Sequence, residues 1–258
     1  MDLKLKGRRA LVTAASRGLG RACAASLVGE GAAVYIVARG RDELAKTAEE
    51  IGAVGRRPLD LANPESPATA VNAAVETLGG LDIVVVNAGG PPPGTFDTTS
   101  PEAWDAGYQL TLQSTVRLIR ASLPHLRDSE QPRIVIVTST SVKEPIPNLL
   151  LSNAFRSAVT AAAKTLSTEL AATGITINCL APGRFATDRV VQLDEANAER
   201  SGKTRQEIER ESKAAIPAGR YGDPAEFGAC CAFLCSRQAS YLTGQTIILD
   251  GGATRGTW

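Results

Sequence analysis

The 258-residue sequence contains one His, one Met, five Cys and few aromatic residues (4%). A single His and an odd number of Cys without regular spacing argue against a zinc site or a Cys/His nucleophile pair. No apolar run approaches the ~20 residues needed to cross a bilayer, and residues 1–7 lack an apolar signal core. The net charge is near +1, which leaves no excess positive field for nucleic acid or a membrane surface. We expect a reduced, cytoplasmic protein without a metal.

Short β-branched runs alternate along the chain with longer Ala-rich segments of helical period. The expected strands are residues 10–13, 33–38, 56–59, 81–86, 133–138, 176–180 and 246–249, and the expected helices are 19–29, 41–51, 67–78, 101–123, 150–172 and 224–234. The strands are apolar throughout, which is typical of a parallel sheet buried on both faces. The sequence therefore predicts one α/β domain over residues 1–258, a doubly wound parallel sheet of about seven strands with helices on both faces.

One segment, residues 188–215, breaks this pattern and is rich in Glu, Arg and Lys. It lies between a strand and the last helix. We interpret it either as a substrate lid or as a solvated pair of surface helices.

A turn of small residues follows the first expected strand and precedes a helix. The N-terminus of a helix presents unpaired N–H groups and the positive end of the helix dipole to an anion. A side chain at Gly18 or Gly20 would block the approach of the backbone to such a ligand. A purely structural turn is the alternative. The residues expected at this diphosphate site are Thr13, Ala15, Ser16, Arg17, Gly18, Leu19 and Gly20.

The end of the second expected strand indicates which dinucleotide binds. Ala38 stands where a NAD site usually has a carboxylate for the ribose hydroxyls. Arg39 follows, and a guanidinium suits a 2′-phosphate, to which Arg17 would add a second charge. Both arginines as plain surface charges are the alternative. The combination favours NADPH (NADP). The other residues expected at this cofactor are Asp60, Leu61, Asn87, Ala88 and Gly89.

Over nearly its whole length the sequence resembles the short-chain dehydrogenase/reductase family, in particular a divergent subgroup of its β-ketoacyl-(acyl carrier protein) reductase-like branch. The matching motifs are residues 13–20, Asp60, Asn87-Ala88-Gly89, Ser139, Pro182-Gly183, Thr187-Asp188 and Asp250-Gly251-Gly252. The resemblance implies a Rossmann-type fold, reduction of a small-molecule carbonyl with a nicotinamide cofactor, and a homotetramer or homodimer. It also implies that Pro182, Gly183 and Thr187 lie near the nicotinamide, with Thr187 bonding its carboxamide.

The sequence departs from the family at the active site, which usually contains an Asn, a Ser and a Tyr-x-x-x-Lys pair. By position these residues correspond to Thr111, Ser139, Ser152 and Arg156, so only the Ser is kept. The first Gly of the phosphate loop is also replaced, by Ala14. A Ser hydroxyl is far less acidic than a Tyr, and an Arg stays charged and cannot pass a proton.

Hydride transfer remains physically reasonable in such a site. Losing a matched general acid typically costs ~10²–10⁴ in rate, whereas positioning the reactants can still supply roughly 7–11 kcal/mol. Lys143 is a candidate replacement proton donor or anchor for an anionic substrate, with a plain surface Lys as the alternative. Arg184 and Lys143 together hint at an anionic group. Residues 90–96, 143–150 and 188–215 are expected to shape the pocket.

Three functions are compatible with these residues. The first is an NADPH-dependent reductase of a ketone or β-ketoacyl group, in which Ser139 polarises the carbonyl and Ser152 and Arg156 support the developing alkoxide. The second is a redox-neutral isomerase or dehydratase that retains the cofactor. The third is a non-catalytic NADPH-binding module.

We predict that calorimetric titration of the protein will show tight NADPH binding and a clear preference over NADH, because Arg17 and Arg39 favour a 2′-phosphate. The measurement needs no knowledge of the substrate. Binding of neither dinucleotide would overturn the assignment to redox chemistry.

Overall fold

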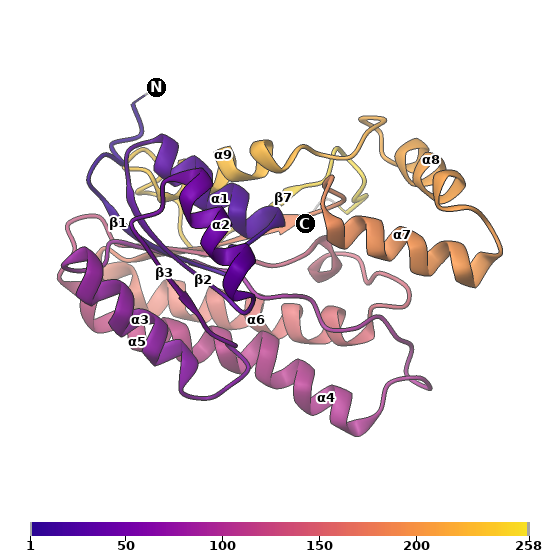
Figure 1. The fold of residues 1–258 in the computed structure, drawn as a ribbon, viewed down its shortest axis with the longest axis horizontal. Helices are drawn as coiled ribbons and strands as arrows, with labels where there is room; N and C mark the ends of the chain where they lie inside the picture. Colours follow the sequence, from indigo (N-terminus) through magenta and orange to yellow (C-terminus); the bar gives the residue numbers. More distant parts are fainter. Residues whose placement is uncertain (1, 257–258) are drawn as a thin grey trace.

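The computed structural model describes residues 2–256, and seven parallel strands form its centre (Figure 1). The strands are β1 (Arg9–Thr13), β2 (Ala33–Ala38), β3 (Gly55–Pro58), β4 (Ile83–Val86), β5 (Arg133–Val137), β6 (Thr176–Pro182) and β7 (Thr246–Leu249). Their order in the sheet is β3-β2-β1-β4-β5-β6-β7, and every neighbouring pair is parallel. The predicted doubly wound sheet is confirmed.

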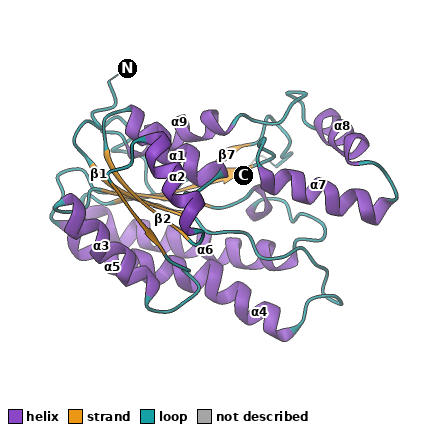
Figure 2. Cartoon of the chain, in the orientation of Figure 1, coloured by secondary structure: helices purple, strands orange, loops and turns teal. Residues whose placement is uncertain are grey.

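Helices cover both faces of this sheet (Figure 2). The helices are α1 (Gly18–Gly29), α2 (Arg41–Ile51), α3 (Ser66–Leu78), α4 (Pro101–Gly107), α5 (Ser114–Arg127), α6 (Leu150–Leu170), α7 (Asp188–Ser201), α8 (Arg205–Ala215) and α9 (Pro224–Cys235). Helices α1, α2 and α9 share one apolar core with one face of the strands, and α3, α5 and α6 share the other. The strands between these layers are apolar throughout because both of their faces are buried.

The expected helix over residues 101–123 is interrupted and longer than predicted. A π-helical segment, η1 (Tyr108–Gln113), separates α4 from α5, and α5 continues past Pro124 to Arg127. Leu126 in that last turn is fully buried, so packing of the helix end outweighs the hydrogen bond that a proline omits. Sequence periodicity does not distinguish a π turn from an α turn.

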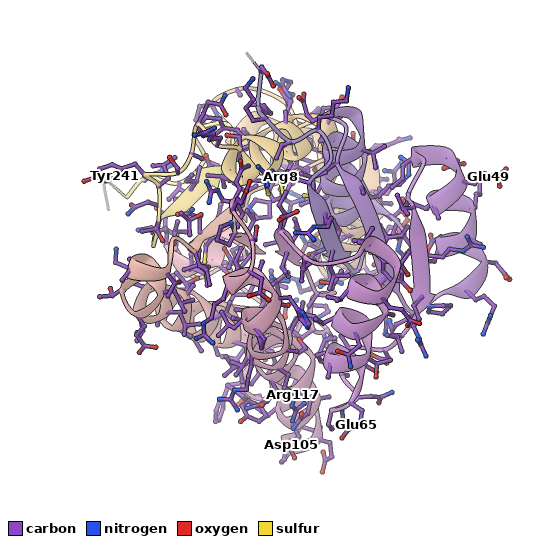
Figure 3. All side chains as sticks on the ribbon, turned by 90° about the vertical axis from the view of Figure 1, so that its left-hand side faces the viewer. Arg8, Glu49, Glu65, Asp105, Arg117 and Tyr241 are labelled. Atoms are coloured by element: carbon purple, nitrogen blue, oxygen red, sulfur yellow. The ribbon has the colours of Figure 1, made fainter. Side chains whose placement is uncertain are left out.

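Residues 188–215 form the helix pair α7 and α8, which projects from one end of the sheet (Figure 1). The surface-helix interpretation is confirmed, and movement of this pair as a lid stays a prediction. Charged side chains such as Glu49 and Glu65 lie at the periphery (Figure 3). No helix between residues 2 and 256 is long and apolar enough to cross a membrane.

An ion pair joins the starts of β1 and β4. Asp82 is 2% exposed, and its carboxylate accepts hydrogen bonds from the backbone N–H and guanidinium of Arg9 (2.9 Å each) and from the Ser129 hydroxyl (2.6 Å). Burial raises the pKa of Asp82, but these bonds outweigh burial and hold the pKa below its ordinary value. This ion pair lies at the amino ends of the strands. The candidate site described below lies at their carboxyl ends.

Asp82→Asn should lower the free energy of unfolding by about 2–3 kcal/mol, because Arg9 would lose its counter-charge. The pKa of the folded state lies below the ordinary value of 3.8, so the contribution of Asp82 is complete above that pH and is lost as pH falls through the folded pKa. Urea unfolding at neutral pH and at about pH 3 would measure this. The gap between variant and wild type should narrow in acid. Asp97→Asn, on an exposed loop, is the control, and an equal loss in both variants would contradict the prediction.

Candidate active site

The ends of β1 and β4 are bonded to each other at the carboxyl edge of the sheet. The Thr13 hydroxyl donates to the Asn87 carbonyl (2.7 Å) and accepts from the Asn87 backbone N–H (2.9 Å). The Asn87 side-chain amide donates to the Ala14 carbonyl (3.3 Å). Between these strands the sheet order reverses direction along the chain. In doubly wound sheets, ligands bind at this reversal.

The loop after β1 fits a diphosphate. Helix α1 begins at Gly18 without a side-chain cap, so its first N–H groups can face an anion. Gly18 adopts a left-handed φ of +56°, and a Cβ at that position would lie 3.7 Å from a Thr187 methyl. A Cβ at Gly20 would lie only 2.3 Å from the Ala14 carbonyl oxygen. The two segments predicted to hold the cofactor, residues 13–20 and Thr187, therefore face each other.

Ala14 adopts a backbone conformation that is unfavourable for a residue with a side chain. Its φ is +47°, in the left-handed region that costs a residue with a Cβ about 1–2 kcal/mol. The residue that stands where the family has a glycine is thus in a strained backbone conformation.

The two arginines predicted to select NADPH have different surroundings. Arg39 is exposed at the end of β2 and takes part in no ion pair found between residues 2 and 256. Arg17 is exposed and lies 3.8 Å from the carboxylate of Asp188 at the start of α7. Their convergence on one phosphate stays a prediction.

The remaining cofactor residues lie at the same edge of the sheet. Leu61 is buried, and the Asp60 carboxylate accepts from the Ala62 backbone N–H (3.0 Å), so its bond to adenine stays a prediction. The Gly183 N–H donates to the Leu249 carbonyl (2.8 Å), which fixes the chain after β6. Ala15 and Ser16 are buried, Leu19, Ala88 and Pro182 are half-buried, and Gly89 is exposed.

Helix α6 brings the four predicted catalytic positions together. It packs against η1, which contains Thr111, and against the short turn η2 (Thr140–Val142) that follows Ser139. Ser152 and Arg156 lie one turn apart on α6 and are each 8% exposed, as their i, i+4 spacing predicts. The Ser139 oxygen accepts a hydrogen bond from the Ser141 backbone N–H (3.1 Å), so its own proton is available to another acceptor.

Arg156 joins the ends of two strands. Its guanidinium donates to the carbonyls of Val137 (2.8 Å), at the end of β5, and Ala88 (3.3 Å), after β4. Burial, and secondarily the charge of Arg189, lowers the pKa of Arg156 to about 10. The side chain is therefore a fixed cation at neutral pH and not a proton donor.

Within residues 2–256, the four Tyr side chains and Lys143, the candidate replacement proton donor, are placed as follows. Lys143 is exposed on the loop after η2, outside the buried group on α6. Tyr221 donates to Asp194 (2.7 Å), and Tyr241 is fully exposed at the periphery (Figure 3). Tyr35 is buried in β2, and Tyr108 contacts Gln113 and Phe155.

The three segments expected to shape the pocket are joined to each other. The Gly94 N–H donates to the Asn148 carbonyl (2.8 Å), and the Leu150 N–H donates to the Gly94 carbonyl (3.2 Å). From α7, the Arg189 guanidinium donates to the Pro91 carbonyl (3.1 Å). Sequence reasoning missed Arg189, although it directly follows the Thr187-Asp188 motif.

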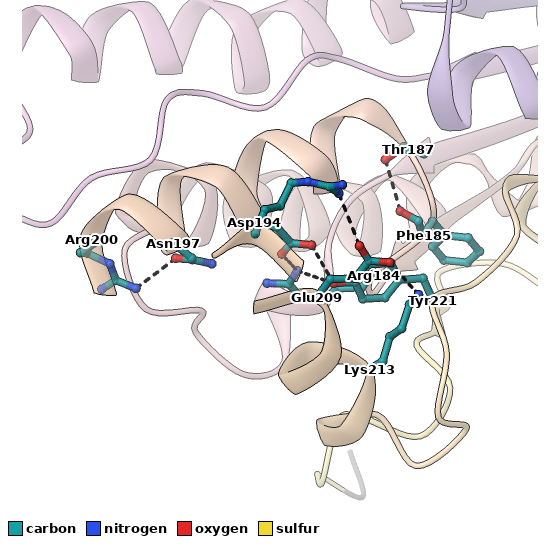
Figure 4. Close-up of polar contacts among 10 residues, drawn as sticks. Arg184, Phe185, Thr187, Asp194, Asn197, Arg200, Glu209, Lys213 and Tyr221 are labelled. Carbon is teal, nitrogen blue, oxygen red and sulfur yellow. Dashed lines mark hydrogen bonds and ion pairs between the residues drawn. The ribbon is translucent and has the colours of Figure 1, made fainter. Parts of the chain in front are cut away.

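The structure corrects the hint that Arg184 attracts an anionic substrate. Its guanidinium binds the carboxylate of Asp194, which is 2% exposed, and Tyr221 donates to the same carboxylate (Figure 4). Lys213 of α8 lies 5.3 Å from the centre of the Tyr221 ring. The charge of Arg184 is neutralised within the protein, where it holds α7 against the chain after β6.

Comparison with known proteins identifies the family to which the chain belongs. The enoyl-(acyl carrier protein) reductase family model matches residues 13–254. The 3-oxoacyl-(acyl carrier protein) reductase FabG of Vibrio cholerae is 34% identical over 97% of this chain and 98% of its own. L-sorbose reductase of Gluconobacter frateurii, solved with NADPH and L-sorbose, superposes with a TM-score of 0.93 at 28% identity, covering 99% of this chain and 100% of its own.

A third protein is a short-chain oxidoreductase of Pseudomonas aeruginosa, solved with NADPH and described as containing an atypical catalytic centre. It is 30% identical with a TM-score of 0.86, covering 96% of this chain and 97% of its own. The chain described here belongs to the short-chain dehydrogenase/reductase family and is an oxidoreductase of its ketoacyl-reductase-like branch.

Thr111→Val should raise the free energy of unfolding by about 1 kcal/mol, because the buried Thr111 hydroxyl has no hydrogen-bond partner among residues 2–256 and valine has the same shape. Thr115→Val is the matched control on the following turn, where the hydroxyl donates to the Thr111 carbonyl (2.8 Å). That variant should not be stabilised. Urea unfolding of both would measure the difference, and destabilisation by Thr111→Val would show that its hydroxyl has a partner.

Proposed function

We propose that this enzyme reduces a ketone or β-ketoacyl group with NADPH, in a site where Ser152 and Arg156 replace the usual Tyr/Lys pair. The observation that carries the proposal is the fixed cation of Arg156, bonded to Val137 two residues before Ser139. The relatives support the reaction class, since one is a 3-oxoacyl reductase and two were solved with NADPH. The atypical centre described for the P. aeruginosa protein supports catalysis by an altered site.

Bound NADPH supplies the hydride that adds to the carbonyl carbon. The residues that would hold the cofactor are those of the loop after β1, with Arg39, Asp60, Asn87, Gly183 and Thr187. Ser139 donates its hydroxyl proton to the carbonyl oxygen, because the Ser139 oxygen is already occupied as an acceptor. Arg156 stabilises the negative charge that develops on the carbonyl oxygen.

Proton delivery differs from that of a Tyr/Lys site. Arg156 keeps its proton at neutral pH, so the oxygen takes its proton from solvent through the hydroxyls of Ser139 and Ser152. The exposed Lys143 lies on the loop after η2, where it attracts an anionic substrate to the pocket. A Ser hydroxyl that regains its proton from solvent is a weaker acid than an activated Tyr. We therefore expect slow turnover.

We further propose that the protein is a homotetramer or homodimer. Helix α6 leaves Ala158 and Ala162 half-buried, and small residues allow another helix to approach closely. Leu166 and Leu170, further along the same stripe, pack instead into the core of the subunit. Light scattering would give the number of subunits.

Ser139→Ala should lower kcat for carbonyl reduction by about 10²-fold or more, because the donor to the developing oxyanion is lost. The dissociation constant for NADPH should stay unchanged. Steady-state kinetics and calorimetry would separate these effects. Ser157→Ala, at an exposed position of α6, is the control and should turn over normally. Unchanged turnover in Ser139→Ala would refute the assigned role.

A further inference from the structure

Two guanidiniums approach the same short stretch of chain after β4. Arg156 donates to the Ala88 carbonyl (3.3 Å), and Arg189 donates to the Pro91 carbonyl (3.1 Å). Gly89 and Gly90 lie between these two carbonyls. A Cβ at Gly90 would be 3.4 Å from an Arg189 nitrogen, while a Cβ at Gly89 would meet no atom within 4 Å. The chain thus leaves open space at Gly89, between the two residues whose carbonyls the guanidiniums contact.

Neither guanidinium has a carboxylate partner. No ion pair found between residues 2 and 256 includes Arg156 or Arg189, whereas Arg9 and Arg184 bind Asp82 and Asp194. Arg156 is nine-tenths buried, and burial lowers the pKa of both arginines. The charge of Arg189 also lowers the pKa of Arg156. Arg189 is exposed, so the cost of an unpaired charge falls on the buried Arg156, whose guanidinium is bonded only to neutral carbonyls.

We infer that Arg156 and Arg189 together bind a carboxylate group of the substrate, which is therefore an oxo acid. Guanidiniums present paired N–H donors that match the two oxygens of a carboxylate. The inference rests on the proposed reductase function, because the carbonyl of the same molecule would lie at Ser139. It narrows the substrate class from ketones in general to ketones that carry a carboxylate.

The position of Arg156 favours the substrate over the cofactor diphosphate. The diphosphate loop follows β1 and ends at the start of α1, where Thr187 lies against Gly18. Arg156 is bonded to the end of β5, and β4 lies between β5 and β1 in the sheet. Arg189 reaches Pro91 on the β4 side. Arg156 is thus displaced from the phosphate loop toward Ser139, whereas Arg189 follows Asp188, whose carboxylate lies 3.8 Å from Arg17 of that loop.

The test is calorimetric titration of the NADP-loaded protein with oxo acids and with their methyl esters. Suitable probes are acetoacetate, 2-oxobutanoate, levulinate and benzoylformate. At least one acid should bind about tenfold more tightly than its ester, a difference of about 1.4 kcal/mol. Arg189→Met should abolish this difference, and Arg189→Lys should keep part of it. Arg120→Met, at an exposed position of α5, should bind like wild type.

Two results would overturn the inference. Equal binding of every acid and its ester, or binding of neither, would show that the guanidiniums do not recognise a carboxylate. Weakened NADPH binding by Arg189→Met, with the preference for acids intact, would assign Arg189 to the cofactor diphosphate.

Turnover of the same probes separates this inference from the proposed function. Reduction of esters and acids with equal KM would sustain the reductase and refute the carboxylate site. Binding of an acid that depends on Arg189, without reduction of any probe, would sustain the carboxylate site and refute the reductase.

Discussion

The two hydrogen bonds from Arg156 to the carbonyls of Val137 and Ala88 hold the active-site edge of the sheet together. Through them α6 is anchored to the ends of β5 and β4. Both acceptors are neutral carbonyls, so the cation is held in place without being neutralised. The positive charge of Arg156 therefore remains available to an oxyanion or a carboxylate. The proposed chemistry depends on this charge.

Asp82 and Arg156, two buried charged residues at opposite ends of the strands, differ in how they are paired. At the starts of the strands, Asp82 has four hydrogen bonds from Arg9 and Ser129. At the carboxyl ends, Ala14 has a left-handed φ, the Thr111 hydroxyl has no partner among residues 2–256, and Arg156 has no carboxylate. Strain and incomplete pairing are tolerated where a ligand binds.

In the proposed site, Ser152 and Arg156 stand in place of a Tyr/Lys pair, and this changes the chemistry available. A Lys can lose its proton near neutral pH when it is buried, whereas Arg156 keeps its charge even with its pKa lowered to about 10. The altered site therefore gives up proton transfer by its cation and retains electrostatic stabilisation. A site that keeps its positive charge in this way suits a substrate that itself carries a negative charge.

The sequence by itself determined the parallel sheet, the phosphate loop and the spacing of Ser152 and Arg156, because periodicity and turn chemistry act over a few residues. Only the tertiary structure decided which charges are paired. Arg184 is neutralised by Asp194, while Arg189 reaches Pro91, 98 residues earlier in the chain. It also decided that residues 108–113 form a π segment packed on α6. Partners so distant in sequence leave no periodic pattern, since their meeting depends on how the helices pack against the sheet.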